Sequence, residues 1–156
     1  MTTPIDALQG VVNANQALPN VVTAGQPAPE HFRALKAAGI EVVLDLRHPS
    51  EPRGFDEPAL MRELGFEYVT IPITDQSLTD QTLDDITRTM RANADRQVLV
   101  HCASGNRIGG ALVPYLMLDH GFSEDDATMA ALRMGLRAAH LLHWGVDYAK
   151  AHADSR

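Results

Sequence analysis

One stretch of the sequence passes from an apolar run directly into a glycine-bearing loop. Residues 98–102 read Val-Leu-Val-His-Cys, and residues 103–110 read Ala-Ser-Gly-Asn-Arg-Ile-Gly-Gly. This order predicts a buried strand, a tight loop and the start of a helix. Backbone N–H groups in such a loop, together with the positive end of a helix, bind anions. We therefore expect an anion-binding nest with Cys102 at its floor and Arg107 at its rim.

Cys102 is the only cysteine of the chain. The loop N–H groups, the following helix and the guanidinium of Arg107 all favour a charged sulfur, so we expect a thiolate that shares its site with an anionic substrate. A small buried hydrophobe at a strand end is the alternative role for a free cysteine. His101, Gly105 and Arg107 beside it favour the catalytic role.

The composition is that of an ordinary globular domain. The 156 residues are expected to form a single domain, 1–156, whose residues 1–19 are loosely ordered. A net charge of −7 argues against nucleic-acid and anionic-membrane partners. The first 25 residues do not resemble a signal peptide, although a leader already removed would leave no trace, and a thiol that stays reduced fits the cytoplasm. No cofactor or metal is expected, and the oligomeric state is left open.

Apolar runs alternate with amphipathic segments along the first two thirds of the chain. Strands are expected at 20–23, 40–46, 66–71 and 98–102, with helices at 29–38, 59–64 and 80–94 between them. Every later segment is helical, including one after Ser123 that should turn Met129, Leu132 and Leu136 inward. The pattern predicts an α/β fold with a mainly parallel central sheet flanked by helices and an all-helical C-terminal part.

These motifs resemble the protein tyrosine phosphatase superfamily, specifically its small dual-specificity-like branch and bacterial phosphatase-like domains. The resemblance runs from about residue 20 to 139 and rests on Thr23-Ala24-Gly25-Gln26-Pro27, Val43-Leu44-Asp45-Leu46-Arg47 with Glu51, Tyr68-Val69-Thr70-Ile71-Pro72, and Val100-His101-Cys102 with Gly105 and Arg107. It implies a phosphatase that hydrolyses a phosphomonoester, on a protein or a small molecule, through a phosphocysteine.

The resemblance also implies roles for individual residues. Cys102 would be the nucleophile, and Arg107 would hold two phosphate oxygens. The substrate-binding loop would be Ala103, Ser104, Gly105, Asn106 and Arg107, which offer their N–H groups to the transition state. His101 would support Cys102 by holding the backbone. Asp75, 27 positions before Cys102, would be the general acid, with Asp80 as the weaker candidate.

Other polar residues are assigned structural roles. Arg47 and Glu51 are expected to form a structural ion pair or loop brace. His140 and His143 lie three apart without a third metal ligand, so we expect histidines of the core or surface. Glu30, Glu57 and the acidic face of 80–85 are explained by solubility alone.

Two departures from the family pattern leave the reaction open. The phosphatase loop places five residues between cysteine and arginine, whereas Cys102 and Arg107 enclose four, as in the sulfur-carrying loop of rhodaneses. Ile108 also replaces the Ser or Thr that usually follows the arginine. A persulfide-forming sulfurtransferase on the same fold is therefore the alternative. A non-catalytic oxyanion-binding module is the third hypothesis.

Overall fold

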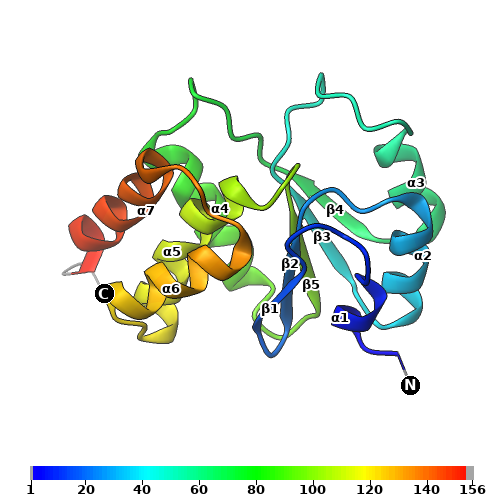
Figure 1. Ribbon diagram of the computed structural model, residues 1–156, viewed down its shortest axis with the longest axis horizontal. Helices are drawn as coiled ribbons and strands as arrows, with labels where there is room; N and C mark the ends of the chain where they lie inside the picture. Colours follow the sequence, from blue (N-terminus) through cyan, green and yellow to red (C-terminus); the bar gives the residue numbers. More distant parts are fainter. Residues whose placement is uncertain (1, 154–156) are drawn as a thin grey trace.

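The computed structural model describes residues 2–153, which contain one five-stranded sheet of order β1-β2-β5-β3-β4 (Figure 1). The strands are β1 (Asn15–Leu18), β2 (Val21–Ala24), β3 (Val42–Asp45), β4 (Glu67–Thr70) and β5 (Val98–His101). Only β1 and β2 pair antiparallel among these strands, and the other three pairs are parallel. The predicted α/β fold with a mainly parallel sheet is confirmed.

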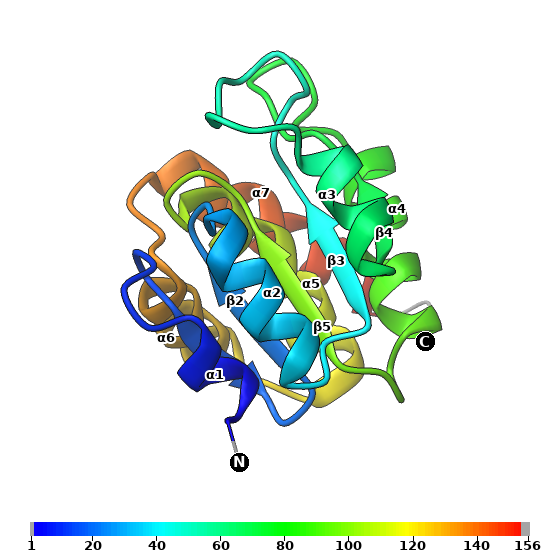
Figure 2. The same cartoon turned by 90° about the vertical axis from the view of Figure 1, so that its right-hand side faces the viewer.

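Helices cover both faces of the sheet. They are α1 (Pro4–Ala7), α2 (Pro29–Ala37), α3 (Glu57–Leu64), α4 (Asp80–Ala92), α5 (Asn106–His120), α6 (Glu124–Met134) and α7 (Ala139–His152). The first three lie on one face and the last four on the other (Figures 1 and 2). After β5 the described chain is helical, as predicted. None of the described helices combines the length and the hydropathy that a membrane crossing requires.

The alternation of side chains along each strand divides the core into two clusters. In β3, Val42 and Leu44 pack with α4 and α5, whereas Val43 packs with α2 and α3. In the central strand β5, Val98 and Val100 face one cluster and Leu99 faces the other. Because both faces of these strands are covered, their sequences are apolar up to the last residue, which is Asp45 in β3 and His101 in β5.

The described N-terminal residues form a short helix and the first strand. The Thr3 side chain accepts a hydrogen bond from the Asp6 N–H, and the Asp6 carboxylate accepts one from the Thr3 N–H, so a capping box begins α1. Leu8 is buried against the α2 side of the core. β1 then extends the sheet by pairing with β2.

The inward face of α6 also differs from the prediction. Leu136 is buried as expected, but Met129 and Leu132 are 54% and 49% exposed. The buried face consists of Ala127, Ala130, Ala131 and Met134. Small residues are needed here because α6 approaches α5 closely. A Cβ atom on Gly109 would lie 2.8 Å from the Leu136 Cβ and 3.1 Å from the Ala131 carbonyl oxygen.

Candidate active site

The loop after β5 lies at the carboxyl edge of the sheet, between the ends of β2 and β3. It turns into α5 at Gly105, whose φ of +102° is in the left-handed region that favours glycine. A Cβ atom at this position would lie 2.1 Å from the Met134 carbonyl oxygen. Gly105 is therefore required both by its backbone conformation and by the approach of α6.

The carbonyl groups of the loop point away from Cys102. The Ala103 oxygen accepts a hydrogen bond of 3.0 Å from the Gln26 N–H. The Ser104 oxygen accepts one of 2.6 Å from Asn13 Nδ2. Because the C=O and N–H of one trans peptide point in opposite directions, the N–H groups of Ser104 and Gly105 are directed inward. The Gly105 N–H donates to Cys102 Sγ at 3.0 Å.

Neighbouring elements hold the loop in this conformation. A Cβ atom on Gly25, just after β2, would lie 2.6 Å from the Ala103 oxygen, so only glycine fits there. The Asn106 side chain accepts hydrogen bonds from the Arg137 and Ala138 N–H groups, at 2.7 and 3.1 Å. The loop is thus fixed by β2 on one side and by the α6–α7 connection on the other.

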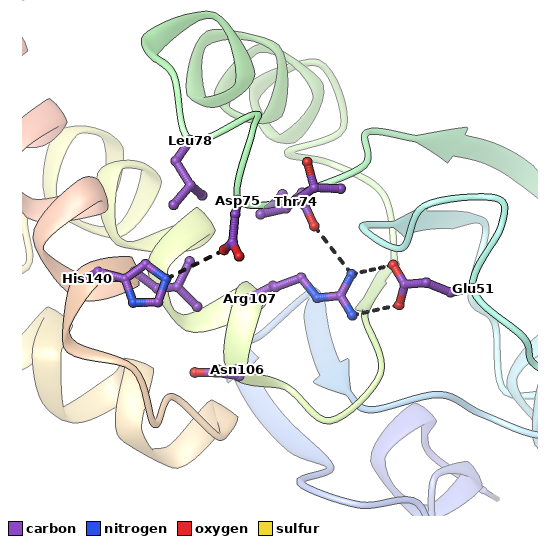
Figure 3. A pocket seen from close by; sticks show the side chains of 9 residues that line it. Glu51, Thr74, Asp75, Leu78, Asn106, Arg107 and His140 are labelled. Atoms are coloured by element: carbon purple, nitrogen blue, oxygen red, sulfur yellow. Dashed lines mark hydrogen bonds and ion pairs between the residues drawn. The ribbon is translucent and has the colours of Figure 1, made fainter.

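A cavity of about 370 Å³ opens at this edge of the sheet. It is lined by Glu51, Ile73, Thr74, Asp75, Leu78, Asn106, Arg107, His140 and Leu141 (Figure 3). Cys102 is only 1% exposed and does not line it. Of the predicted site residues, Asp75, Asn106 and Arg107 therefore meet at the cavity, while Cys102 lies behind it.

The Arg107 guanidinium is partly engaged. Nη1 and Nη2 each donate to a carboxylate oxygen of Glu51 at 2.8 Å (Figure 3). Nη1 also approaches the Leu46 and Ile73 carbonyl oxygens at 3.4 Å. Among residues 2–153, the Nε–H and the second N–H on Nη2 have no partner. These two donors form the side of the guanidinium that can bind two oxygens of an anion.

Glu51 joins Arg107 to a second arginine. Arg47 Nε donates to Glu51 Oε1 at 3.1 Å, which confirms the predicted structural ion pair. The hydrogen bond from Arg107 is the largest cause that lowers the pKa of Glu51 to about 2, against the opposing effect of partial burial. The same bond raises the pKa of Arg107. Glu51 therefore stays ionised and fixes the direction of Arg107.

Asp75 and His140 face each other across the cavity rim (Figure 3). Asp75 follows β4 in the loop before α4 and is 89% exposed in its side chain. His140, in the first turn of α7, is 61% exposed, and its Nε2 lies 4.0 Å from Asp75 Oδ1. The surface position of His140 agrees with the sequence interpretation, but its place at the rim was not foreseen. No sequence signal marks it, because the approach of α7 is a tertiary feature.

An ionic cluster whose two carboxylates and histidine are fully buried lies behind Cys102, on the α2 and α3 side of β5. His101 Nε2 is 2.6 Å from Glu57 Oε2, and Arg53 Nη1 donates to Glu57 Oε1 at 2.8 Å and to Asp45 Oδ2. The assignment of Glu57 to solubility is wrong, since its side chain has no solvent exposure. Asp45, Glu57 and His101 converge closely enough to hold a metal ion. The Arg53 guanidinium already bonds to both carboxylates, so this donor set does not fit a metal.

The architecture and the loop define a small phosphatase-type α/β domain with a cysteine at the floor of its anion nest. A family model described as "Polymorphic toxin system, DSP-PTPase phosphatase" matches residues 19–121. The chain belongs to this family of dual-specificity and protein tyrosine phosphatases, which confirms the resemblance.

A curated relative agrees with this assignment, and solved structures share the fold. Dual specificity protein phosphatase 26 of Rattus norvegicus is 32% identical over 115 residues, which are 71% of this chain and 54% of that protein. The chain thus spans about half the length of the curated relatives it matches. Among solved structures, a DUF442 phosphatase of Shewanella putrefaciens CN-32 superposes with a TM-score of 0.80 at 24% identity, covering 96% and 97% of the two chains. TpbA of P. aeruginosa superposes with a TM-score of 0.67 at 15% identity, covering 96% and 94%.

Proposed function

We propose that this protein is a cysteine-dependent phosphatase that hydrolyses phosphomonoesters through a phosphocysteine. The observation that carries the proposal is the Gly105 N–H directed at Cys102 Sγ, with the loop carbonyls turned outward and bonded elsewhere. Such a nest stabilises negative charge on sulfur and on the equatorial oxygens of a transferring phosphoryl group. Membership of the phosphatase family supports the same reaction.

In the first step, the Cys102 thiolate forms an S–P bond as the ester P–O bond breaks. The loop N–H groups from Ala103 to Arg107 and the unpaired side of Arg107 bind the phosphoryl oxygens. Because Cys102 is 1% exposed, substrate entry must uncover Sγ, and we propose that the Arg107 side chain or the 74–79 loop shifts to do so. Both border the cavity.

Asp75 is proposed to protonate the leaving oxygen. Its position on the cavity rim, opposite His140, is consistent with this role. In the second step the ionised Asp75 accepts a proton from water, which attacks phosphorus and breaks the S–P bond. Inorganic phosphate leaves, and the thiolate is restored.

The substrate class extends from phosphorylated proteins to small phosphomonoesters. TpbA of P. aeruginosa was crystallised, as a cysteine-to-serine variant, in complex with phosphotyrosine, which makes aryl phosphates the first substrates to test here. No nucleic-acid or membrane partner is proposed, given the net charge of −7. A cytoplasmic location is proposed from the reduced state that the Cys102 thiol needs.

A persulfide-forming sulfurtransferase is the second candidate, favoured by the four residues between Cys102 and Arg107. The two reactions are separated by assaying the native protein with an aryl phosphate and with thiosulfate plus cyanide. We expect aryl phosphate turnover that Cys102→Ser abolishes and no formation of thiocyanate. Thiocyanate formation, with an adduct of roughly 32 Da on Cys102 and no phosphate release, would favour sulfur transfer instead.

A further inference from the structure

Both ring nitrogens of His101 face oxygen atoms. Nε2 lies 2.6 Å from Glu57 Oε2 and 3.8 Å from Asp45 Oδ1, while Nδ1 lies 3.3 Å from the carbonyl oxygen of Cys102. Carboxylates and carbonyls accept hydrogen bonds and donate none. A neutral imidazole donates from one nitrogen only, whereas an imidazolium donates from both. In this completely buried site, only the doubly protonated ring donates to both the Glu57 carboxylate and the Cys102 carbonyl. Asp45 Oδ1 already accepts from the Arg47 N–H.

We propose that Glu57 is a positioning residue for the nucleophile, because its carboxylate keeps His101 as an imidazolium whose Nδ1–H holds the Cys102 carbonyl. The positive ring then stabilises the neighbouring thiolate. This inference rests on the proposed function, since it concerns the same cysteine. It assigns a catalytic purpose to a buried acid that neither the sequence nor the cavity identifies.

The surrounding charges support a cationic His101. Three carboxylates and three guanidinium groups form one connected cluster around the site, namely Asp45, Glu51 and Glu57 with Arg47, Arg53 and Arg107. Their formal charges cancel. An imidazolium adds one positive charge, which a thiolate on Cys102 cancels in turn. A buried charge without a partner is costly, so this count favours charging His101 and Cys102 together.

The cluster also connects the two ends of the active-site loop. Hydrogen bonds run in sequence through Arg107, Glu51, Arg47, Gln26, Glu57 and His101 to the Cys102 carbonyl. Each bond in this path is between 2.6 and 3.3 Å long. The arginine and the cysteine of the loop are therefore held from behind by one network, in which the bond to Glu57 is the shorter of the two hydrogen bonds of the His101 ring.

The environment of Glu57 is consistent with its ionised form. Burial by itself raises the pKa of this carboxyl, but the hydrogen bond and charge of His101, with further bonds from Gln26 and Arg53, hold it well below its ordinary range. The groups that face His101 are Glu57 from α3, Asp45 from β3 and the uncharged ring of Phe32 from α2. Arg53 lies behind both carboxylates and bonds to each.

Nitrogen-15 NMR of the native protein at pH 7 tests the proposal without any substitution at Glu57. The His101 signals are assigned by their loss in His101→Gln. We expect two ring N–H resonances and nitrogen shifts of an imidazolium for His101, because both ring nitrogens have acceptors. A neutral ring with one N–H at pH 7 would overturn the proposal.

Alkylation of Cys102 by iodoacetamide provides the second measurement. In Glu57→Gln we expect the pH of half-maximal alkylation rate to rise by roughly one unit, because a charge partner of His101 is lost, with partial recovery in Glu57→Asp. Glu67→Gln, which removes an exposed carboxylate paired with Arg96, is the matched control. An unchanged profile in folded Glu57→Gln would also overturn the proposal.

If Glu57→Gln does not fold, the NMR measurement decides alone. Neither measurement depends on turnover. A native protein with a doubly protonated His101 and no hydrolysis of any phosphomonoester would therefore contradict the proposed function while supporting the charge arrangement inferred here.

Discussion

The Glu51 carboxylate accepts two hydrogen bonds from the Arg107 guanidinium, each 2.8 Å long. Glu51 thereby directs Arg107 and leaves its other side open to an anion. Glu51→Gln removes one charged acceptor, so we expect kcat/KM for an aryl phosphate to fall by about 10- to 100-fold. This fold-change corresponds to the free energy that a charged hydrogen bond contributes. Steady-state kinetics measures this, with Glu67→Gln as control. Equal activity in native protein and Glu51→Gln would show that Arg107 needs no such support.

The same carboxylate gives the fold a specific acid sensitivity. The pKa of Glu51 is lowered from 4.5 to about 2, mainly by the Arg107 hydrogen bond, so the unfolded chain binds a proton more readily than the folded one. Its stabilising effect is present above pH 4.5 and is lost as the pH falls toward 2. Thermal unfolding between pH 6 and pH 2 should show a decline in Tm over this window that is smaller in Glu51→Gln. If Tm falls with pH equally in the native protein and in Glu51→Gln, Glu51 is not a source of the acid sensitivity.

The loop requires glycine at position 105 because of its positive φ and because the Met134 oxygen approaches it closely. Gly105→Ala should lower the free energy of unfolding by roughly 2 kcal/mol or more. The alanine would have to adopt a φ of +102°, and its Cβ atom would lie 2.1 Å from the Met134 carbonyl oxygen. Gly39→Ala is the control, since it has a φ of +104° and no atom within 4 Å of the added Cβ. Denaturant unfolding compares the two. If Gly105→Ala lowers the free energy of unfolding by no more than Gly39→Ala does, the close approach of the Met134 oxygen makes no contribution.

Asp75 carries the proposed acid role. Asp75→Asn should lower kcat by about 10²-fold or more for alkyl phosphates, whose leaving oxygens need a proton, and only slightly for nitrophenyl phosphate. Asp80→Asn, at the start of α4, serves as control. Steady-state kinetics with a series of phosphomonoesters measures how kcat of each variant depends on the basicity of the leaving group. If Asp75→Asn lowers kcat equally for all of them, Asp75 does not protonate the leaving group.

The sequence predicted the sheet and the loop because both are encoded locally. The run from Val98 to Cys102 and the glycine at 105 determine strand, turn and helix within a dozen residues. The sequence did not predict β1, because its residues show little alternation of apolar and polar side chains. Its place in the sheet comes from pairing with β2.

The candidate site was predictable only in part. Cys102, Arg107 and Asp75 carry signals in residue type and spacing. Glu57 and His101 meet across 44 positions, and His140 meets Asp75 across 65, through packing that no local pattern contains. A buried glutamate at the start of a helix has the same sequence signature as a solvated one, so only the fold distinguishes them.

Trapping the covalent intermediate tests the central claim most directly. Native protein mixed with an aryl phosphate and quenched with acid within its turnover time is digested and analysed by mass spectrometry, with Cys102→Ser as control. We predict a phosphoryl adduct of about 80 Da on Cys102 that is absent from Cys102→Ser. Phosphate release at a normal rate by Cys102→Ser, without an adduct on residue 102 in either protein, would contradict the account.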